Sequence, residues 1–148
     1  MGMFKKRAKV SNSKKAELFF EEEFWIDTGA LYSFAPEDCL ERIGVEPSAT
    51  RNLVLADGRQ ETRLFGFCDF QIEGLEGSFP CPVIFAPKGS LFLIGATALE
   101  NFGVEVDPGQ KRLKPILAVI GGFLASSRAD KNNDSRPLYS SSSSTFSP

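Results

Sequence analysis

Residues 24–30 read Phe-Trp-Ile-Asp-Thr-Gly-Ala, which places an acid directly after an apolar segment and at the start of a tight turn. Residues 18–26 are rich in aromatic side chains, so they are predicted to form a strand that ends at Asp27. The Thr28 hydroxyl can hydrogen-bond nearby backbone, and Gly29 lets other groups approach closely. A buried, constrained carboxylate is costly without partners, so the presence of Asp27 needs a reason. Taken alone, an Asp-Thr-Gly tripeptide is better explained as an ordinary turn.

The residue types that are missing exclude several chemistries. The chain has 148 residues and no histidine, so a Ser-His-Asp site, a Cys-His site and a histidine metal site are impossible within it. The three cysteines, Cys39, Cys68 and Cys81, form no Cys-x-x-Cys pair and lie in apolar contexts, which favours small buried side chains. We therefore predict no metal and no cofactor, and we expect any chemistry to use carboxylates, hydroxyls, lysines or backbone amides.

Charge and hydropathy argue against nucleic-acid and membrane partners. Charged residues make up 24% of the chain and the net charge is -2, so there is no global basic field to attract nucleic acid. The longest apolar run, residues 115–125, is shorter than the about 20 residues that a bilayer-spanning helix needs. Reduced cysteines are typical of the cytosol, so the sequence predicts a cytoplasmic protein.

Composition divides the chain into three zones. Residues 1–15 are rich in lysine with little to bury, and they are predicted to form a basic flexible arm. Residues 16–124 are apolar-rich and punctuated by turn signals, so they are predicted to be the folded domain. Residues 125–148 are polar and end in a serine-rich run, which predicts a disordered tail.

Turn signals in the middle zone predict many short strands and two short helices. Asp57-Gly58 lies between two apolar segments and predicts a hairpin with these residues at its tip. This pattern favours a mostly β fold, a small closed β-barrel with one or two short helices. The other expected elements are a helix over 36–43 with Pro36 at its first position and Gly44 at its end, a hairpin at 74–77 followed by a strand over 79–85, a strand over 91–94, a helix over 96–102 closed by Gly103, a turn at 107–109 and a last strand over 113–120.

The order of these signals carries a resemblance to a known family. Residues 26–30 read Ile-Asp-Thr-Gly-Ala, the Asp57-Gly58 hairpin follows, and residues 93–95 read Leu-Ile-Gly before the second helix and the last strand. With its parts in this order, the chain resembles the retropepsin-like, or retroviral-type, aspartic proteases, and especially their small prokaryotic members. The resemblance covers roughly residues 16–120, and a random β domain would rarely reproduce the order.

The resemblance implies an aspartic endopeptidase in which two carboxylates share a proton and activate a water. The chain has a single Asp-Thr-Gly and is too short for a two-lobed enzyme, so the second carboxylate would be Asp27 of an identical subunit in a homodimer. Thr28 would lock the two turns together, and Gly29 would give the backbone of a peptide or protein substrate room to approach. The implied substrate-binding residues are Ala30 and, at the tip of a flap, Ala56, Asp57 and Gly58.

Several alternatives stay open at the level of sequence. The flap of the viral enzymes is richer in glycine than this charged hairpin, and Asp57-Gly58 is as well explained by an ordinary turn as by substrate contact. Tyr32 and Ser33 follow the Asp27 turn, where buried packing and a place in the cleft are equally expected. A retropepsin-like module that dimerises or binds peptides without cutting them is the alternative function. A nucleic-acid adaptor would rest on the basic arm alone, whose few lysines give only weak, salt-sensitive binding.

Overall fold

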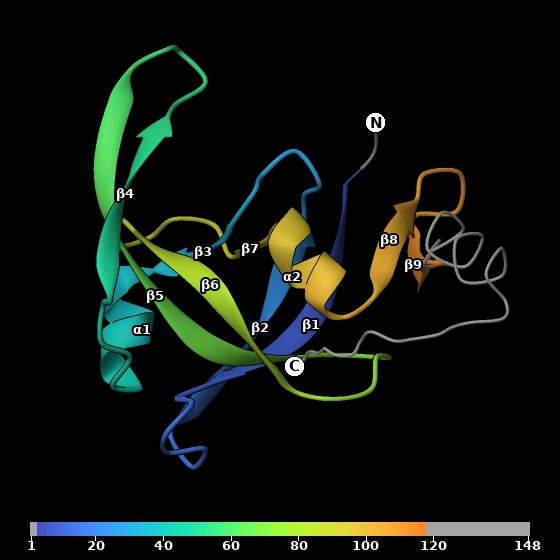
Figure 1. Ribbon diagram of the computed structural model, residues 1–148, viewed down its shortest axis with the longest axis horizontal. Coiled ribbons are helices and arrows are strands. Elements are labelled where there is room, and N and C mark those ends of the chain that lie inside the picture. The colour runs from blue at the N-terminus through green and yellow to red at the C-terminus, as the bar shows by residue number, and fades with distance from the viewer. Residues whose placement is uncertain (1–2, 118–148) are drawn as a thin grey trace, which may run out of the picture. The chain divides into compact units, whose positions relative to one another are not determined.

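The computed structural model describes residues 3–117, and the colours of Figure 1 follow the chain through them. These residues form nine strands and two short helices. In chain order they are β1 (Phe4–Ser11), β2 (Phe19–Ile26), β3 (Ser33–Pro36), α1 (Glu37–Arg42), β4 (Ala49–Val54), β5 (Gln60–Ile72), β6 (Phe79–Ala86), β7 (Leu93–Ile94), α2 (Ala96–Asn101), β8 (Val104–Asp107) and β9 (Arg112–Pro115). The predicted mostly β fold with two short helices is confirmed.

Seven strands form one sheet in the order β1-β2-β7-β3-β6-β5-β4, and β1 also pairs with β5. The short strand β7 is inserted between β2 and β3, although it follows both in sequence. It runs parallel to β2, with Trp25 opposite Leu93 and Ile26 opposite Ile94, and it pairs antiparallel with β3 through Phe34 and Leu93. The chain segment after residue 90 therefore reaches the point where β2 ends.

The core lies on the inner side of this sheet and is rich in aromatic rings. Phe24, Phe70 and Phe85 are among the largest fully buried side chains. The ring of Phe24 meets those of Phe70 and Phe92 edge-on, with centroids 5.7 and 5.3 Å apart. Each such buried side chain contributes about 1.5–3 kcal/mol of hydrophobic stabilisation. The end of β2 is thus anchored firmly just before Asp27.

The prediction of a flexible arm over residues 1–15 is wrong for its central part. Residues 4–11 form β1, which pairs with β2 along its whole length, from Phe4 opposite Ile26 to Ser11 opposite Phe19. Ala8 and Val10 are buried in the core, while Arg7 is exposed and lies 3.6 Å from Glu21 of β2. Basic and apolar residues alternate from Arg7 to Val10 as in a strand with one buried face, but Lys6 lies on the same face as Ala8 and breaks the pattern.

The predicted hairpins and helices are confirmed with small shifts of their ends. β4 and β5 form the hairpin with Asp57-Gly58 at its tip, and Figure 1 shows it extending past the neighbouring strands. Pro36 is the N-cap of α1 rather than its first helical residue. The last strand is predicted over 113–120, whereas β9 is Arg112–Pro115, and the Ile116 N–H continues its pairing by donating to the carbonyl of Gly103 at 2.8 Å. Residues 118–120 and the predicted serine-rich tail lie outside the described residues.

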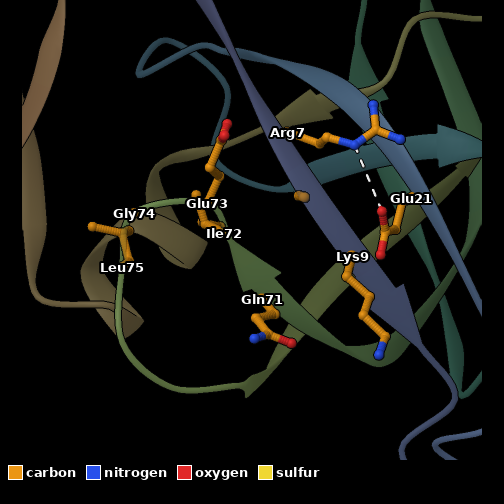
Figure 2. A pocket seen from close by; sticks show the side chains of 9 residues that line it. Arg7, Lys9, Glu21, Gln71, Ile72, Glu73, Gly74 and Leu75 are labelled. Atoms are coloured by element: carbon orange, nitrogen blue, oxygen red, sulfur yellow. Dashed lines mark ion pairs between the residues drawn. The ribbon is translucent and has the colours of Figure 1, made fainter.

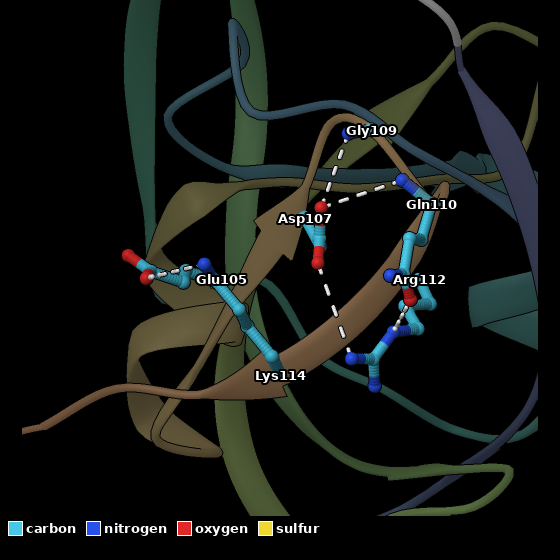
Figure 3. Close-up of polar contacts among 6 residues, drawn as sticks. All are labelled: Glu105, Asp107, Gly109, Gln110, Arg112 and Lys114. Carbon is cyan, nitrogen blue, oxygen red and sulfur yellow. Dashed lines mark hydrogen bonds and ion pairs between the residues drawn. The ribbon is translucent and has the colours of Figure 1, made fainter.

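β8 and β9 form a separate two-stranded sheet whose connection is the predicted turn at 107–109. The Asp107 carboxylate accepts the N–H groups of Gly109 and Gln110 at 3.1 and 3.3 Å, and the Arg112 guanidinium lies 4.0 Å away (Figure 3). A carboxylate that binds backbone two residues ahead is a common way of closing a turn. Within residues 3–117, no helix is both long and apolar enough to cross a membrane.

Candidate active site

Asp27 occupies the first position after β2, and its side chain is fixed by its own turn. The Gly29 N–H donates to the Asp27 carboxylate at 2.9 Å. The Ala30 N–H donates to the Asp27 carbonyl at 3.2 Å, and the Asp27 N–H donates to the carbonyl of Ile94 at 3.0 Å. The backbone N–H and carbonyl of Asp27 are therefore both hydrogen-bonded, and the Gly29 N–H fixes the position of one carboxylate oxygen.

A second segment, the end of β7 and the start of α2, supports the turn from behind. The Ala96 N–H donates to the Ala30 carbonyl at 2.8 Å, and the Thr97 N–H donates to the Leu31 carbonyl at 3.0 Å. These bonds join segments about 66 residues apart in sequence, which local turn chemistry alone cannot hold together. The segment that contains the Leu-Ile-Gly motif is thus hydrogen-bonded directly to the segment that contains the Asp-Thr-Gly motif.

Gly95 is the point of closest approach between the two segments. A Cβ placed on Gly95 would overlap the carbonyl of Tyr32 and would lie 2.7 Å from the carbonyl oxygen of Ala30. The Gly95 N–H donates to the buried hydroxyl of Ser33 at 3.1 Å. Only glycine fits here, because the neighbouring atoms belong to backbone that cannot rotate away.

The turn is solvent-accessible despite this support. Asp27 and Ala30 are half-buried, and Thr28 and Gly29 are exposed. Leu31, which follows them, is 61% exposed. Among the ion pairs of residues 3–117, none involves Asp27. The carboxylate is thus rigidly held and available to a ligand or to another protein surface.

The predicted flap residues lie apart from this turn. Ala56, Asp57 and Gly58 form a three-residue hairpin loop in which the Leu55 N–H donates to the Arg59 carbonyl at 2.7 Å and Gly58 has a φ of 88°. Glycine is favoured in that left-handed conformation. The Arg59 side chain donates to the Asp57 carboxylate at 2.7 Å, and hydrogen bonds from the Arg59 backbone and side chain lower the pKa of Asp57. In the described residues, no hydrogen bond joins this tip to the Asp27 turn.

The two residues with open alternatives, Tyr32 and Ser33, both make packing contacts. Ser33 is buried and holds the Gly95 N–H, so it positions the Asp27 turn through backbone. The Tyr32 ring meets Phe65 of β5 edge-on at 5.1 Å, and its hydroxyl accepts a 3.4 Å hydrogen bond from Arg51 of β4. The Arg51 guanidinium also lies 3.9 Å from the centroid of the Phe65 ring. Sequence reasoning missed Arg51, because nothing in the pattern of β4 marks it.

Neither of two open hollows on the surface is lined by residues of the Asp27 turn. The first, of about 410 Å³, lies against β1, β2 and β5, where Arg7, Lys9, Gln71 and Glu73 surround it together with Glu21 (Figure 2). The second, of about 510 Å³, lies between the β1–β2 loop and the segment that follows α1. In residues 3–117, no three His, Cys, Asp or Glu side chains are grouped as metal ligands would be.

No protein-family model and no curated protein sequence matches the chain. Among solved structures, it is similar to the protease of simian foamy virus (mac), with 18% identity over 66% of this chain and 92% of that one, and a TM-score of 0.46. It is also similar to a retropepsin-like aspartic protease from Rickettsia conorii, with 14% identity over 72% of this chain and 89% of that one, and a TM-score of 0.45. The class named for the second structure is the one that the sequence resembles.

Proposed function

We propose that this protein is an aspartic endopeptidase that acts as a homodimer, with Asp27 of each subunit forming the catalytic pair. The observation that carries the proposal is the state of the Asp27 carboxylate. It accepts the Gly29 N–H at 2.9 Å, the backbone N–H of the same residue donates to the Ile94 carbonyl at 3.0 Å, and the carboxylate stays accessible. Such rigid support for an accessible acid is what a catalytic group requires.

Two-fold symmetry would supply the second carboxylate. A symmetric dimer places a residue on the axis opposite its own copy, and two carboxylates that meet there share one proton. The ionised carboxylate takes a proton from a water, whose oxygen attacks the carbonyl carbon of the scissile peptide bond. The protonated carboxyl gives its proton to the carbonyl oxygen, and the resulting tetrahedral intermediate collapses as a proton passes to the leaving amine.

The other residues of the turn would serve this geometry. Thr28 is exposed, so its hydroxyl is free to hydrogen-bond the opposite turn. A Cβ on Gly29 would lie 3.2 Å from the Asp27 carboxylate, so glycine keeps the space beside the acid open for a peptide backbone. Ala30 would line the same space with a small side chain.

The β4–β5 hairpin would act as the flap. β6 pairs with β5 only from Phe65 onward, so residues 60–64 of β5 are paired with β4 alone. A two-stranded ribbon has little stability of its own, which suits a segment that closes over a substrate. Ala56, Asp57 and Gly58 at its tip would then contact the peptide.

Two further points complete the proposal. Pairing of β1 with both β2 and β5 supports a closed barrel.

The three cysteines are free thiols in the structure. Free thiols fit a location in the cytoplasm, where the environment is reducing.

The alternative is a retropepsin-like module that dimerises or binds peptides without cutting them. One observation favours it, because the Asp57 carboxylate at the hairpin tip is bound by Arg59 of the same loop. A tip whose charges satisfy each other offers fewer free groups to hold a substrate.

Peptide-library cleavage by purified wild type and Asp27→Asn, from about pH 3 to about pH 8, tests the proposal. Asp107→Asn is the matched control, because Asp107 also binds the N–H two residues ahead, at 3.1 Å, but lies in the β8–β9 turn. We expect wild type and Asp107→Asn to cleave, Asp27→Asn to be inactive, and all three to have the mass of a dimer in solution. Equal cleavage by wild type and Asp27→Asn refutes the proposal, and a folded dimer that cleaves nothing supports the non-proteolytic alternative.

A further inference from the structure

Two buried cysteines lie directly opposite each other across neighbouring strands. Cys68 of β5 and Cys81 of β6 are partners in the antiparallel register, and neither is exposed at all. Both are free thiols. Opposite residues in an antiparallel pair project to the same face, so both sulfur atoms point into the same part of the core.

The flanking prolines define the type of this pair. Pro82 is opposite Phe67 and Pro80 is opposite Asp69. Proline has no N–H, so its place in a ladder is a non-hydrogen-bonded pair. Because the two kinds of pair alternate, Cys68 and Cys81 form a hydrogen-bonded pair, in which the Cα atoms are about 5.5 Å apart.

That separation suits a disulfide that is under strain. Disulfide-linked cysteines usually have Cα atoms about 5.5–6 Å apart but Cβ atoms only about 3.8 Å apart. The Cβ atoms of directly opposite residues are about 4.5–5.5 Å apart, toward the upper end in a hydrogen-bonded pair. Bond formation would therefore draw β5 and β6 together locally, and strained disulfides are more easily reduced than structural ones.

The surroundings of Cys81 place its sulfur just beneath the surface. The amide nitrogen of exposed Asn101 in α2 lies 3.8 Å from the Cys81 sulfur and also donates to the Pro80 carbonyl at 3.1 Å. Burial raises the pKa of Cys81 to about 11 and raises that of Cys68 as well. Thiolate is the reactive form, so reaction is slow in the closed strands and needs their transient opening.

We propose that Cys68 and Cys81 are a redox modification site. The two thiols form a reversible disulfide with each other, and a small-molecule disulfide such as oxidised glutathione is the oxidant. One cysteine thiolate attacks the oxidant, whose sulfur–sulfur bond breaks and releases one glutathione thiolate. The second cysteine thiolate attacks the mixed disulfide and releases the other. Two protons and two electrons pass from the protein to the oxidant. This inference does not depend on the proposed protease activity.

The test refolds the full-length chain in buffers with increasing ratios of oxidised to reduced glutathione, followed by acid quench, alkylation and mass spectrometry of the intact chain and its peptides. Cys39→Ser is the matched control, because it removes the third thiol, which lies in α1. We expect wild type and Cys39→Ser to lose two hydrogens, with a cross-link between the Cys68 and Cys81 peptides. We also expect half-conversion within the range of glutathione buffers, and reversal by reduced glutathione.

Three results would overturn the proposal. The first is alkylation of both Cys68 and Cys81 even in oxidised glutathione alone, and the second is a disulfide that uses Cys39 instead. The third is loss of tertiary packing when the Cys39→Ser protein is oxidised, measured by near-ultraviolet circular dichroism. The proposed disulfide must form within the native register of β5 and β6, so loss of packing would exclude it.

Discussion

Gly95→Ala should break the support of the Asp27 turn, although it adds only one methyl group. The new Cβ would overlap the Tyr32 carbonyl and lie 2.7 Å from the Ala30 carbonyl oxygen. Both neighbours are backbone atoms on the segment that carries Asp27, so neither can move without moving the turn. The Gly95 N–H would also be pulled from the Ser33 hydroxyl that it meets at 3.1 Å.

The magnitude follows from the rigidity of these neighbours. Overpacking in a filled core costs about 1–3 kcal/mol, and more where nothing can yield. We expect a loss of about 3 kcal/mol in the free energy of unfolding, which is a large part of the 5–15 kcal/mol that stabilises a typical domain. For a domain of this size, the midpoint of thermal unfolding should fall by roughly 10 °C.

Chemical and thermal unfolding of Gly95→Ala and Gly109→Ala measures the effect. Gly109 is the matched control, because a Cβ there would make only an ordinary contact, 3.6 Å from the Asp107 carboxylate, and its φ is not in the left-handed region. We expect Gly109→Ala to unfold close to wild type. If Gly95→Ala has the unfolding midpoint of wild type, the close approach at Gly95 is not what holds the turn, and the reasoning is wrong.

Three further predictions concern the same site and the hairpin tip. Asp27→Asn should abolish peptide cleavage yet leave the unfolding midpoint unchanged, because an amide oxygen can still accept the Gly29 N–H; a large loss of stability would mean that the acid is structural. Ser33→Ala should cost about 1–3 kcal/mol in denaturant unfolding, because the buried Gly95 N–H loses its partner; an unchanged midpoint would contradict this. The pKa of Asp57 is lowered by its bonds to Arg59, so the order they give the tip should be present above the usual carboxyl range and lost as the pH falls. In an NMR titration, the Arg59 amide resonance should change with a pH midpoint below the usual carboxyl range. A midpoint within or above that range would count against the bond.

The local parts of this fold were predictable because their signals are local. The Asp57-Gly58 hairpin, the turn after Ile26 and the helix after Gly95 each follow from residues within a few positions of one another. β1 was missed although its alternation is equally local. Its apolar side is short, and Lys5, Arg7 and Lys9 dominate its composition, so the charged residues conceal the period of a strand.

The contacts that build the site were not predictable in the same way. Ser33 and Gly95 are 62 residues apart, and their hydrogen bond exists only because β7 enters the sheet between β2 and β3. No periodicity in sequence encodes which strand is inserted between which others. The order of the two motifs is visible in the sequence and carries the resemblance to a family, but the fit of Gly95 against the Tyr32 carbonyl depends on how the folded segments lie in space.

The position of β7 also bears on the proposed pairing of two chains at Asp27. Inserting β7 beside β2 fixes the backbone on the inner side of the Asp27 turn through Ile94, Ala96 and Thr97. Within the described part of the chain, the outer side, with Thr28 and Gly29, has no such support and is exposed. A turn that is held so closely on one side and open on the other is better suited to meet a second surface than to bind a peptide by itself. A second copy of the same turn would present both the missing hydroxyl and the missing carboxylate at once, so assembly and catalysis should be lost together when the outer side is blocked by a bulky residue at Thr28.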